Sequence, residues 1–353
     1  MKARALRCLF SLPIGIALLG CGESDGAPTS DTIDIAFIPK TSNNLVFKLG
    51  NDGAQFAARS LNHAGGRQVD VEYLASPALD PGVEQSLIRQ AIAAKKDALL
   101  VSCIDDSVAN AIDEAVDSGI PVITYDSDCP NSKRVGFYSM DNESTAAKGA
   151  DLLGAAMGEG KKTVAILTGR AGADNLKRRV AGFVDRLAAE YPDVSVVTTV
   201  YCGETAEECG PAVESEIIAQ YPELDGLFVA GLWGLLSACS CSDTGMACTC
   251  SDGQMPNWKR AAKGKLKTVA FDSLPFQLTL MSQGYVSALL GQKYFGWGYE
   301  TVSVMYDHLT TGSTVSAFID SGVDVVCPNN VASMAANWDA ADFSAPLTPD
   351  CSL

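Results

Sequence analysis

The sequence predicts an α/β fold with two lobes, each a doubly wound parallel sheet with helices on both faces. Short apolar runs alternate with amphipathic helical patterns from Ile33 onward, as in repeated βαβ units. After Asp141-Asn142 the alternation begins again. The length of 353 residues also exceeds that of one average domain. Two similar halves are expected to face each other, and the cleft between them is the default ligand site.

The elements of the first half follow from hydrophobic periodicity. Apolar runs rich in β-branched residues predict strands, and apolar residues on one helical face predict helices. The run IDIAFI, residues 33–38, is the first predicted strand, and a helical face follows from Leu49 to Ala64. The remaining elements are strands at 69–74, 97–103 and 121–126 and helices over 82–95 and 107–118.

The second half repeats this pattern with one interruption. Helices are predicted over 143–157, 175–190 and 207–220, and strands at 163–169, 194–202, 224–231, 267–272 and 286–291. Only Cys239 to Gln254 breaks the alternation, because it lacks apolar periodicity. We expect this segment to be a surface loop tied by its own four cysteines.

The composition is that of a soluble protein without a nucleic-acid partner. Hydrophobic residues make up 47% of the chain and charged residues 19%, which is ordinary for a folded protein. The formal net charge is −16, so no excess of positive charge is available to neutralise phosphates.

The N-terminus has the features of an export signal. Lys2, Arg4 and Arg7 form a positive region, and the apolar stretch Cys8 to Leu19 is too short to span a bilayer. The ending Leu18-Leu19-Gly20-Cys21 resembles a bacterial lipobox, which implies a lipoprotein signal peptide over 1–20 and lipidation of Cys21. A plain cleaved signal peptide is the alternative. Residues 21–31 have the composition of a flexible tether.

The cysteines suit an oxidising compartment. Setting aside Cys8 and Cys21 leaves ten of the twelve, an even number. The sequence suggests the pairs Cys103 with Cys129, Cys202 with Cys209, and Cys327 with Cys351. The other four, Cys239, Cys241, Cys248 and Cys250, are expected to form two more disulfides, although their CxC spacing would also suit zinc.

The segment IPVITYDSD, residues 120–128, is a predicted buried strand that ends in hydrogen-bonding groups. In open parallel sheets ligands sit outside the carboxyl ends of the strands, so Asp126 is placed to meet a small molecule. A helix cap or turn aspartate is the alternative interpretation.

Other predicted strands also end in polar or aromatic residues. Each such residue has an ordinary explanation, such as a solvated lysine, a capping asparagine or a core phenylalanine. Together they offer charged donors, acceptors, amides and aromatic faces, which a polyhydroxylated ligand requires. The candidate ligand-binding set is Lys40, Asn43, Asn44, Phe47, Asp126, Asn175, Arg179, Trp233, Asp272 and Gln292.

These motifs resemble those of the periplasmic sugar-binding proteins of the ribose-binding type, the solute receptors of ABC importers. The resemblance covers nearly the whole chain after the signal. It rests on IPK (38–40), TSNNLVFKLGNDGA (41–54), IPVITYD (120–126), NLKRRVAGF (175–183), VAFD (269–272) and ALLGQ (288–292). It implies that Lys40, Asn44, Phe47, Asp126, Arg179, Asp272 and Gln292 contact a sugar. The chain differs from ribose binders at Val46, Ser127 and Gly231, and Trp233 is expected to supply stacking.

The resemblance also implies a type I periplasmic binding protein with two lobes joined by three crossovers. These would lie near 140–142, 291–293 and 321–322. The N-terminal lobe would comprise 32–140 plus 293–320, the C-terminal lobe 141–292 plus 321–338, and the tail 339–353.

The expected function is that of an extracytoplasmic solute-binding lipoprotein. It would capture a monosaccharide or similar polyol in the cleft and deliver it to an ABC permease, as a monomer without cofactor or metal, anchored at the bacterial cell envelope on the periplasmic or outer surface. The alternative is a receptor that reports a sugar-like signal to a membrane sensor.

A catalytic function has little support in the sequence. The only histidines, His63 and His308, lie in helical segments, and no HExxH motif occurs. Asp126 and Asp272 could be imagined as the carboxylate pair of a glycosidase. The surrounding donors favour binding, and we expect no enzymatic activity.

Overall fold

The computed structural model describes residues 32–236, 239–241, 248–249, 265–340, 347–348 and 350–352. The expected signal peptide, Cys21 and the tether lie outside these residues, as does most of the predicted cysteine loop. The residues from Thr32 onward form one compact unit. Among the described residues, no helix has both the length and the apolar character needed to cross a membrane.

The first sheet is entirely parallel, with strand order β13-β5-β4-β3-β1-β2. Its central strands β3 and β4 are buried along their whole length, which explains their continuous apolar runs. The strands are β1 Thr32–Ile38, β2 Gln68–Tyr73, β3 Ala98–Val101, β4 Val122–Tyr125, β5 Gly136–Ser139 and β13 Ile319–Asp320.

The second sheet has the order β14-β12-β11-β8-β6-β7 and is parallel except at its edge. There β14 pairs antiparallel with β12, which is common on an otherwise parallel sheet. The strands are β6 Lys162–Thr168, β7 Val194–Tyr201, β8 Gly226–Val229, β11 Lys267–Phe271, β12 Ala288–Gly291 and β14 Asp324–Val326.

The chain passes between the two sheets three times, after β5, after β12 and after β13. Two α/β lobes joined by three crossovers confirm the predicted fold class. The strands β5, β13 and β14 were not predicted, because they are short and lack a clear apolar alternation.

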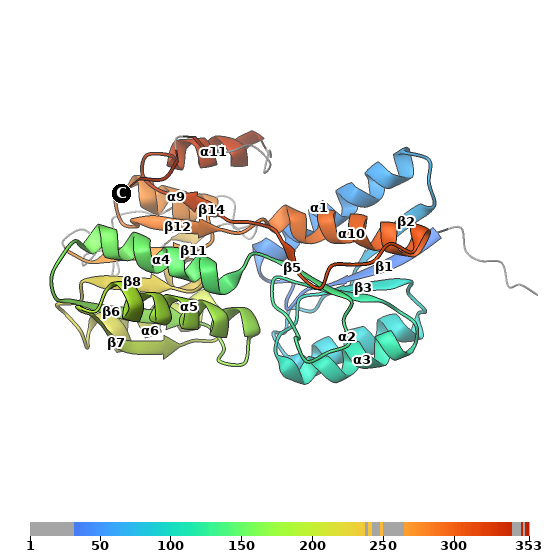
Figure 1. Cartoon of the computed structure of the whole chain (residues 1–353), viewed down its shortest axis with the longest axis horizontal. Coiled ribbons are helices and arrows are strands. Elements are labelled where there is room, and N and C mark those ends of the chain that lie inside the picture. The colour runs from blue at the N-terminus through green and yellow to red at the C-terminus, as the bar shows by residue number, and fades with distance from the viewer. Residues whose placement is uncertain are drawn as a thin grey trace, which may run out of the picture. The chain divides into compact units, whose positions relative to one another are not determined.

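Helix α10 belongs with the first sheet although it comes late in the chain, and it runs beside α1 (Figure 1). Glycines allow this close approach: a Cβ at Gly53 would lie 2.0 Å from the carbonyl oxygen of Phe295, and one at Gly298 would lie 2.0 Å from that of Gly50. The helices of this lobe are α1 Leu45–His63, α2 Pro81–Ala93, the short 3₁₀ helix η1 Asp106–Val108, α3 Ala109–Asp117 and α10 Tyr294–Thr311.

The second lobe carries the remaining helices. Helix α4 packs along α5 (Figure 1), and Phe183 of α5 stacks on Phe228 of strand β8 with ring centroids 3.9 Å apart. These helices are α4 Asn142–Met157, α5 Asp174–Glu190, α6 Ala206–Ala212, the π-helical η2 Val213–Ile218, α7 Trp233–Leu236, α9 Pro275–Ser282 and α11 Val331–Ala340. A small antiparallel pair, β9 Ser240–Cys241 and β10 Cys248–Thr249, lies within the predicted cysteine loop.

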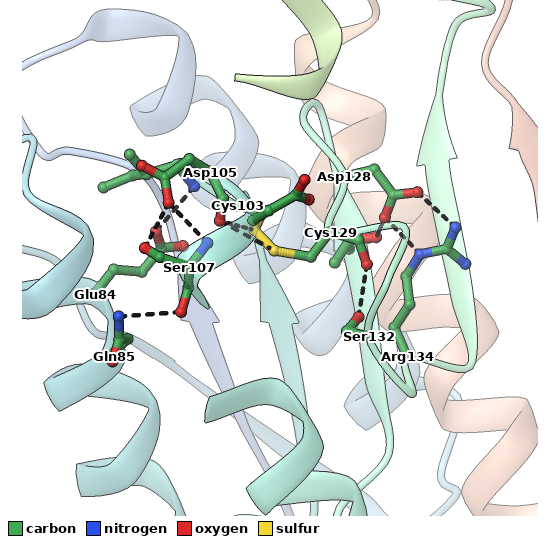
Figure 2. Close-up of a disulfide and its surroundings, with 12 residues drawn as sticks. Glu84, Gln85, Cys103, Asp105, Ser107, Asp128, Cys129, Ser132 and Arg134 are labelled. Carbon is green, nitrogen blue, oxygen red and sulfur yellow. Dashed lines mark hydrogen bonds and ion pairs between the residues drawn. A yellow bond between two sulfur atoms is a disulfide. The ribbon is translucent and has the colours of Figure 1, made fainter. Parts of the chain in front are cut away.

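The structure contains disulfides between Cys103 and Cys129, between Cys202 and Cys209, and between Cys327 and Cys351. The first joins the loops that follow β3 and β4 (Figure 2). Cys239 is also disulfide-bonded. The side chains of Cys241, Cys248 and Cys250 lie outside the described residues, so the choice between disulfides and zinc in that loop stays a prediction.

Candidate ligand-binding site

Asp126 and Asp272 occupy equivalent positions in the two lobes. Each directly follows a central strand, β4 or β11. Both adopt left-handed backbone conformations, with φ of 61° and 75°, which aspartate tolerates better than most residues. The Asp126 N–H donates to the Tyr138 carbonyl (3.2 Å) and the Asp272 N–H to the Leu290 carbonyl (2.8 Å). The neighbouring strand thus holds each aspartate in the same way.

One cavity brings the predicted residues together. Every member of the candidate set except Asn43 lines it, with side chains from both lobes. The cavity encloses about 480 Å³ of atom-free space, a volume that includes open solvent. Asn43 is exposed, and its side-chain amide donates to the Pro77 carbonyl at 3.2 Å outside the cavity.

Around Asp126 the first lobe supplies most partners. Ser102 Oγ donates to Asp126 Oδ2 at 2.9 Å, and Lys40 Nζ lies 3.8 Å from the same oxygen. From the second lobe, Asn175 Nδ2 donates to Asp126 Oδ1 at 3.3 Å and Asn175 Oδ1 accepts from Lys40 Nζ at 3.4 Å. Lys40 and Asp126 are only 5% and 4% exposed, so each charge compensates the other in a largely dry site.

Around Asp272 a second polar cluster forms. Gln292 Nε2 and Tyr294 Oη both donate to Asp272 Oδ1, at 2.7 and 2.9 Å. Among the described residues, these two side-chain bonds fall on Oδ1 only, which leaves Oδ2 able to accept from a ligand hydroxyl. Burial raises the pKa of Asp272, and the nearby charge of Arg179 opposes that rise.

Arg179 is fixed by four neighbours. Its Nη2 donates to Gln292 Oε1 at 2.9 Å, its Nη1 to the Ala230 carbonyl at 2.9 Å and its Nε to Asn142 Oδ1 at 2.8 Å. The guanidinium also lies over the Phe271 ring, 4.1 Å from the centroid. Burial lowers its pKa. Since guanidinium stays protonated in proteins, it remains a positive charge beside the cavity.

Aromatic side chains form the apolar part of the lining. Phe47 and Trp297 pack at a centroid distance of 5.8 Å, and Trp233 contributes from the second lobe. A Cβ at Gly231 would lie 2.3 Å from a ring carbon of Trp233, so the indole occupies space that any side chain at 231 would need. The absence of a side chain at 231 and the presence of Trp233 are therefore two parts of one arrangement.

Three residues at the site were not identified from the sequence: Trp297 lines the cavity, whereas Tyr294 and Ser102 hydrogen-bond its two aspartates. Trp297 and Tyr294 lie in α10, where apolar spacing indicates core and gives no sign of a nearby cavity. Ser102 follows β3, and its position at a strand end was an available signal. Asn44 has two roles, since it caps α1 by accepting from the Val46 N–H at 3.2 Å and also lines the cavity.

The sequence of this chain is similar to those of several known proteins. A sequence model described as a periplasmic binding protein domain matches residues 35–314. The ribose import binding protein of Salmonella typhimurium is 26% identical over 304 residues, covering 86% of this chain and 93% of that protein. The xylitol-binding protein of Mycolicibacterium smegmatis is 25% identical over 218 residues, but the match covers 61% of this chain and only 59% of that protein.

A solved structure of an ABC transporter solute-binding protein from Burkholderia graminis, in complex with D-arabinose, is 29% identical with a TM-score of 0.74. The alignment covers 85% of this chain and 97% of that one. A carbohydrate transporter solute-binding protein from Agrobacterium radiobacter has the same TM-score at 24% identity, covering 87% and 98% of the two chains, and shows the shared fold.

Proposed function

We infer a function in the capture and delivery of a sugar, and the premise is that the chain belongs to the periplasmic binding protein family. The protein would bind a monosaccharide or similar polyol in the cavity lined by both lobes and deliver it to an ABC transporter. Its relatives include sugar-binding solute receptors of ABC transporters, which are not enzymes.

The observation that carries this proposal is the pair of equivalent aspartates at one cavity. Carboxylate oxygens accept from sugar hydroxyls, whereas Lys40 and Arg179 donate to them. Because each sugar hydroxyl both donates and accepts, a site with both kinds of group around it suits a polyol. Phe47, Trp233 and Trp297 offer apolar faces to the C–H surface of the ring.

Charge balance favours an uncharged ligand. The cavity places the cations Lys40 and Arg179 against the carboxylates Asp126 and Asp272, and it also includes Glu204. No positive charge is left over to recognise a phosphate or a carboxylate. A neutral sugar or sugar alcohol matches this balance better than a sugar phosphate or an amino acid does.

We propose in addition that Cys21 is lipidated and anchors the protein at the cell envelope, with residues 21–31 as a tether. The family is periplasmic by description. We also propose the lobe limits 32–140 plus 293–320 and 141–292 plus 321–338. The chain order of the two sheets supports these limits.

A thermal-shift screen of the purified protein tests the binding proposal. The compounds are D-ribose, D-arabinose, D-fucose, D-xylose and xylitol, with D-ribose 5-phosphate as a charged comparison. A ligand that binds only the folded state raises the apparent stability by mass action. We expect at least one neutral compound to raise the melting temperature, and D-ribose 5-phosphate to have less effect. The absence of any shift with the neutral compounds would count against a sugar site.

A further inference from the structure

A second, larger cavity adjoins the candidate sugar site. It holds about 1070 Å³ of atom-free space, part of it open to solvent. The two cavities share six lining residues, Thr41, Asn44, Leu79, Glu204, Leu232 and Trp233. Because the two cavities share these residues, the second adjoins the first and is not a separate site elsewhere on the surface.

The walls of the second cavity differ chemically from those of the first. Leu45, Leu79 and Leu236 line it and are only partly covered by protein. Glu204 and Glu207 also line it, whereas its described lining includes no lysine or arginine. Lys40 and Arg179 line the first cavity only. Partly exposed leucines favour contact with an apolar group, and the two carboxylates disfavour an anion.

Trp233 connects the two cavities. Its indole lies against the position of the absent Gly231 side chain, where it is 8% exposed, and it lines both spaces. A substituent on a ring that contacts Trp233 in the first cavity would therefore pass Leu79 and Leu232, which also line both spaces, to enter the second. A free monosaccharide would leave that apolar wall facing water.

We propose that the second cavity receives an uncharged, mainly apolar substituent on the sugar, so that the protein binds glycosides with an apolar aglycone. The sugar ring would lie among the polar groups of the first cavity, and the aglycone between Leu45, Leu79 and Leu236. This inference rests on the proposed sugar-binding function.

Isothermal titration calorimetry with paired compounds tests the inference. The probes are the free sugars D-ribose, D-arabinose, D-fucose and D-xylose and, for each, the methyl and the phenyl glycosides of both anomers. Burial of the phenyl group against leucines should make one phenyl glycoside bind about tenfold more tightly than the matching methyl glycoside. A 4-carboxyphenyl glycoside of the same sugar should lose most of that gain beside Glu204 and Glu207.

Substitutions in the second cavity distinguish its contribution to binding from that of the first. Leu236→Ser and Leu45→Ser should each reduce the phenyl gain and leave the affinity for the methyl glycoside nearly unchanged, since neither leucine lines the first cavity. Two variants on different elements keep the test valid if one fails to fold. Leu61→Ser, a partly buried leucine of α1 that does not line the second cavity, is the matched control and should keep the full gain.

The outcomes distinguish this inference from the proposed function. If free sugars bind but no phenyl glycoside binds more tightly than its methyl partner, or if the gain survives both variants, the aglycone site is refuted and sugar binding stands. If neither free sugars nor glycosides bind, sugar binding is refuted and the aglycone site with it.

Discussion

At the scale of single residues, the position of the Trp233 indole depends on Gly231. A Cβ at 231 would approach the ring to 2.3 Å, so a Gly231→Ala protein must move the indole. Aromatic contacts of this kind contribute roughly 0.5–1.5 kcal/mol, so sugar affinity should fall about three- to tenfold. Calorimetry with the best sugar from the screen measures this change, and Trp233→Leu should show a loss of similar size. Unchanged affinity in both variants would remove Trp233 from the site.

Glu84 gives the folded protein a pH-dependent contribution to stability. Its Oε2 accepts from the Ile104 N–H at 2.9 Å, but its buried Oε1 has no hydrogen-bond partner among the described residues. Burial raises the pKa of Glu84 from 4.5 to about 8, although the nearby charge of Lys40 acts in the opposite direction. The folded state therefore favours the protonated, neutral carboxyl.

The sign of the effect follows from this raised pKa. Between about pH 4.5 and pH 8 the folded state binds more protons at Glu84 than the unfolded state, so its stabilising contribution is present below that window and is lost as pH rises through it. The slope is about 1.4 kcal/mol per pH unit. Glu84→Gln should remove this slope in denaturant titrations across the window, whereas Glu190→Gln, at an exposed position, should keep it. Parallel curves for Glu84→Gln and the parent would contradict the assignment.

The sequence placed residues at the cavity correctly where their position at a strand end determines their surroundings, whereas their role in ligand binding stays a prediction. Asp126, Asp272 and Gln292 directly follow strands, and parallel strands bring their carboxyl ends to one edge. Asn43 does not line the first cavity, because its exposed side chain donates to the Pro77 carbonyl, and both residues line the second cavity instead. Trp297 could not be found, because its contact with the cavity depends on how α10 packs against α1.

At the scale of elements, the loops after β3 and β4 act as one unit. The disulfide between Cys103 and Cys129 joins them (Figure 2). The Cys103 N–H also donates to the Ser127 carbonyl at 3.0 Å. Ser102 precedes Cys103 in the loop after β3, and its hydroxyl donates a hydrogen bond to the carboxylate of Asp126, which lies in the loop after β4. The covalent link therefore limits movement of the aspartate and its partner.

Removing this disulfide should affect both stability and binding. The double variant Cys103→Ser/Cys129→Ser should lose about 2–4 kcal/mol of stability and also several-fold in sugar affinity, because the Asp126 loop gains freedom. The matched control is Cys327→Ser/Cys351→Ser, which opens a loop of similar length, 24 against 26 residues of separation, without a lining residue of the cavity. It should lose stability but keep its affinity. If the two double variants bind the sugar with equal affinity, the disulfide between Cys103 and Cys129 has no role in positioning Asp126.

Element prediction failed where long-range pairing replaces local pattern. Strand β5 is four residues long and its sequence GFYS has no strong period, yet it is buried because β4 and β13 flank it. Strands β13 and β14 are similarly short and form where the chain passes between lobes. Such strands form because neighbouring strands pair with them, and the β-propensity of their own side chains contributes little.

At the scale of the whole molecule, the proposed anchor predicts where the protein is found. Acyl chains on Cys21 would contribute about 0.8 kcal/mol per buried methylene and hold the protein at a membrane. Cys21→Ala expressed in a bacterial host should move from the membrane fraction to the soluble fraction, as measured by immunoblotting after ultracentrifugation. Cys8→Ala, within the expected signal peptide, is the control and should stay with the membrane. A Cys21→Ala protein that still sediments with the membrane would rule out this anchor.

The fold of the whole molecule gives the site its symmetry. Two sheets of similar order each end a central strand in a left-handed aspartate, and side chains from both lobes meet around one cavity. Neither lobe alone offers both carboxylates. One sugar bound by both aspartates would therefore bridge the two lobes.

Calorimetric titration of the best sugar from the screen into Asp126→Ala, Asp272→Ala and the parent protein tests whether both aspartates bind the sugar. Loss of a charge-assisted hydrogen bond in a desolvated site costs roughly 1.5–3 kcal/mol, so each variant should bind about ten- to a hundredfold more weakly. Asp225→Ala is the control, since Asp225 bonds Thr163 at the opposite end of the second sheet and does not line the cavity, and its affinity should match the parent. If Asp126→Ala and Asp272→Ala both bind the sugar as tightly as the parent, the two aspartates do not form the site.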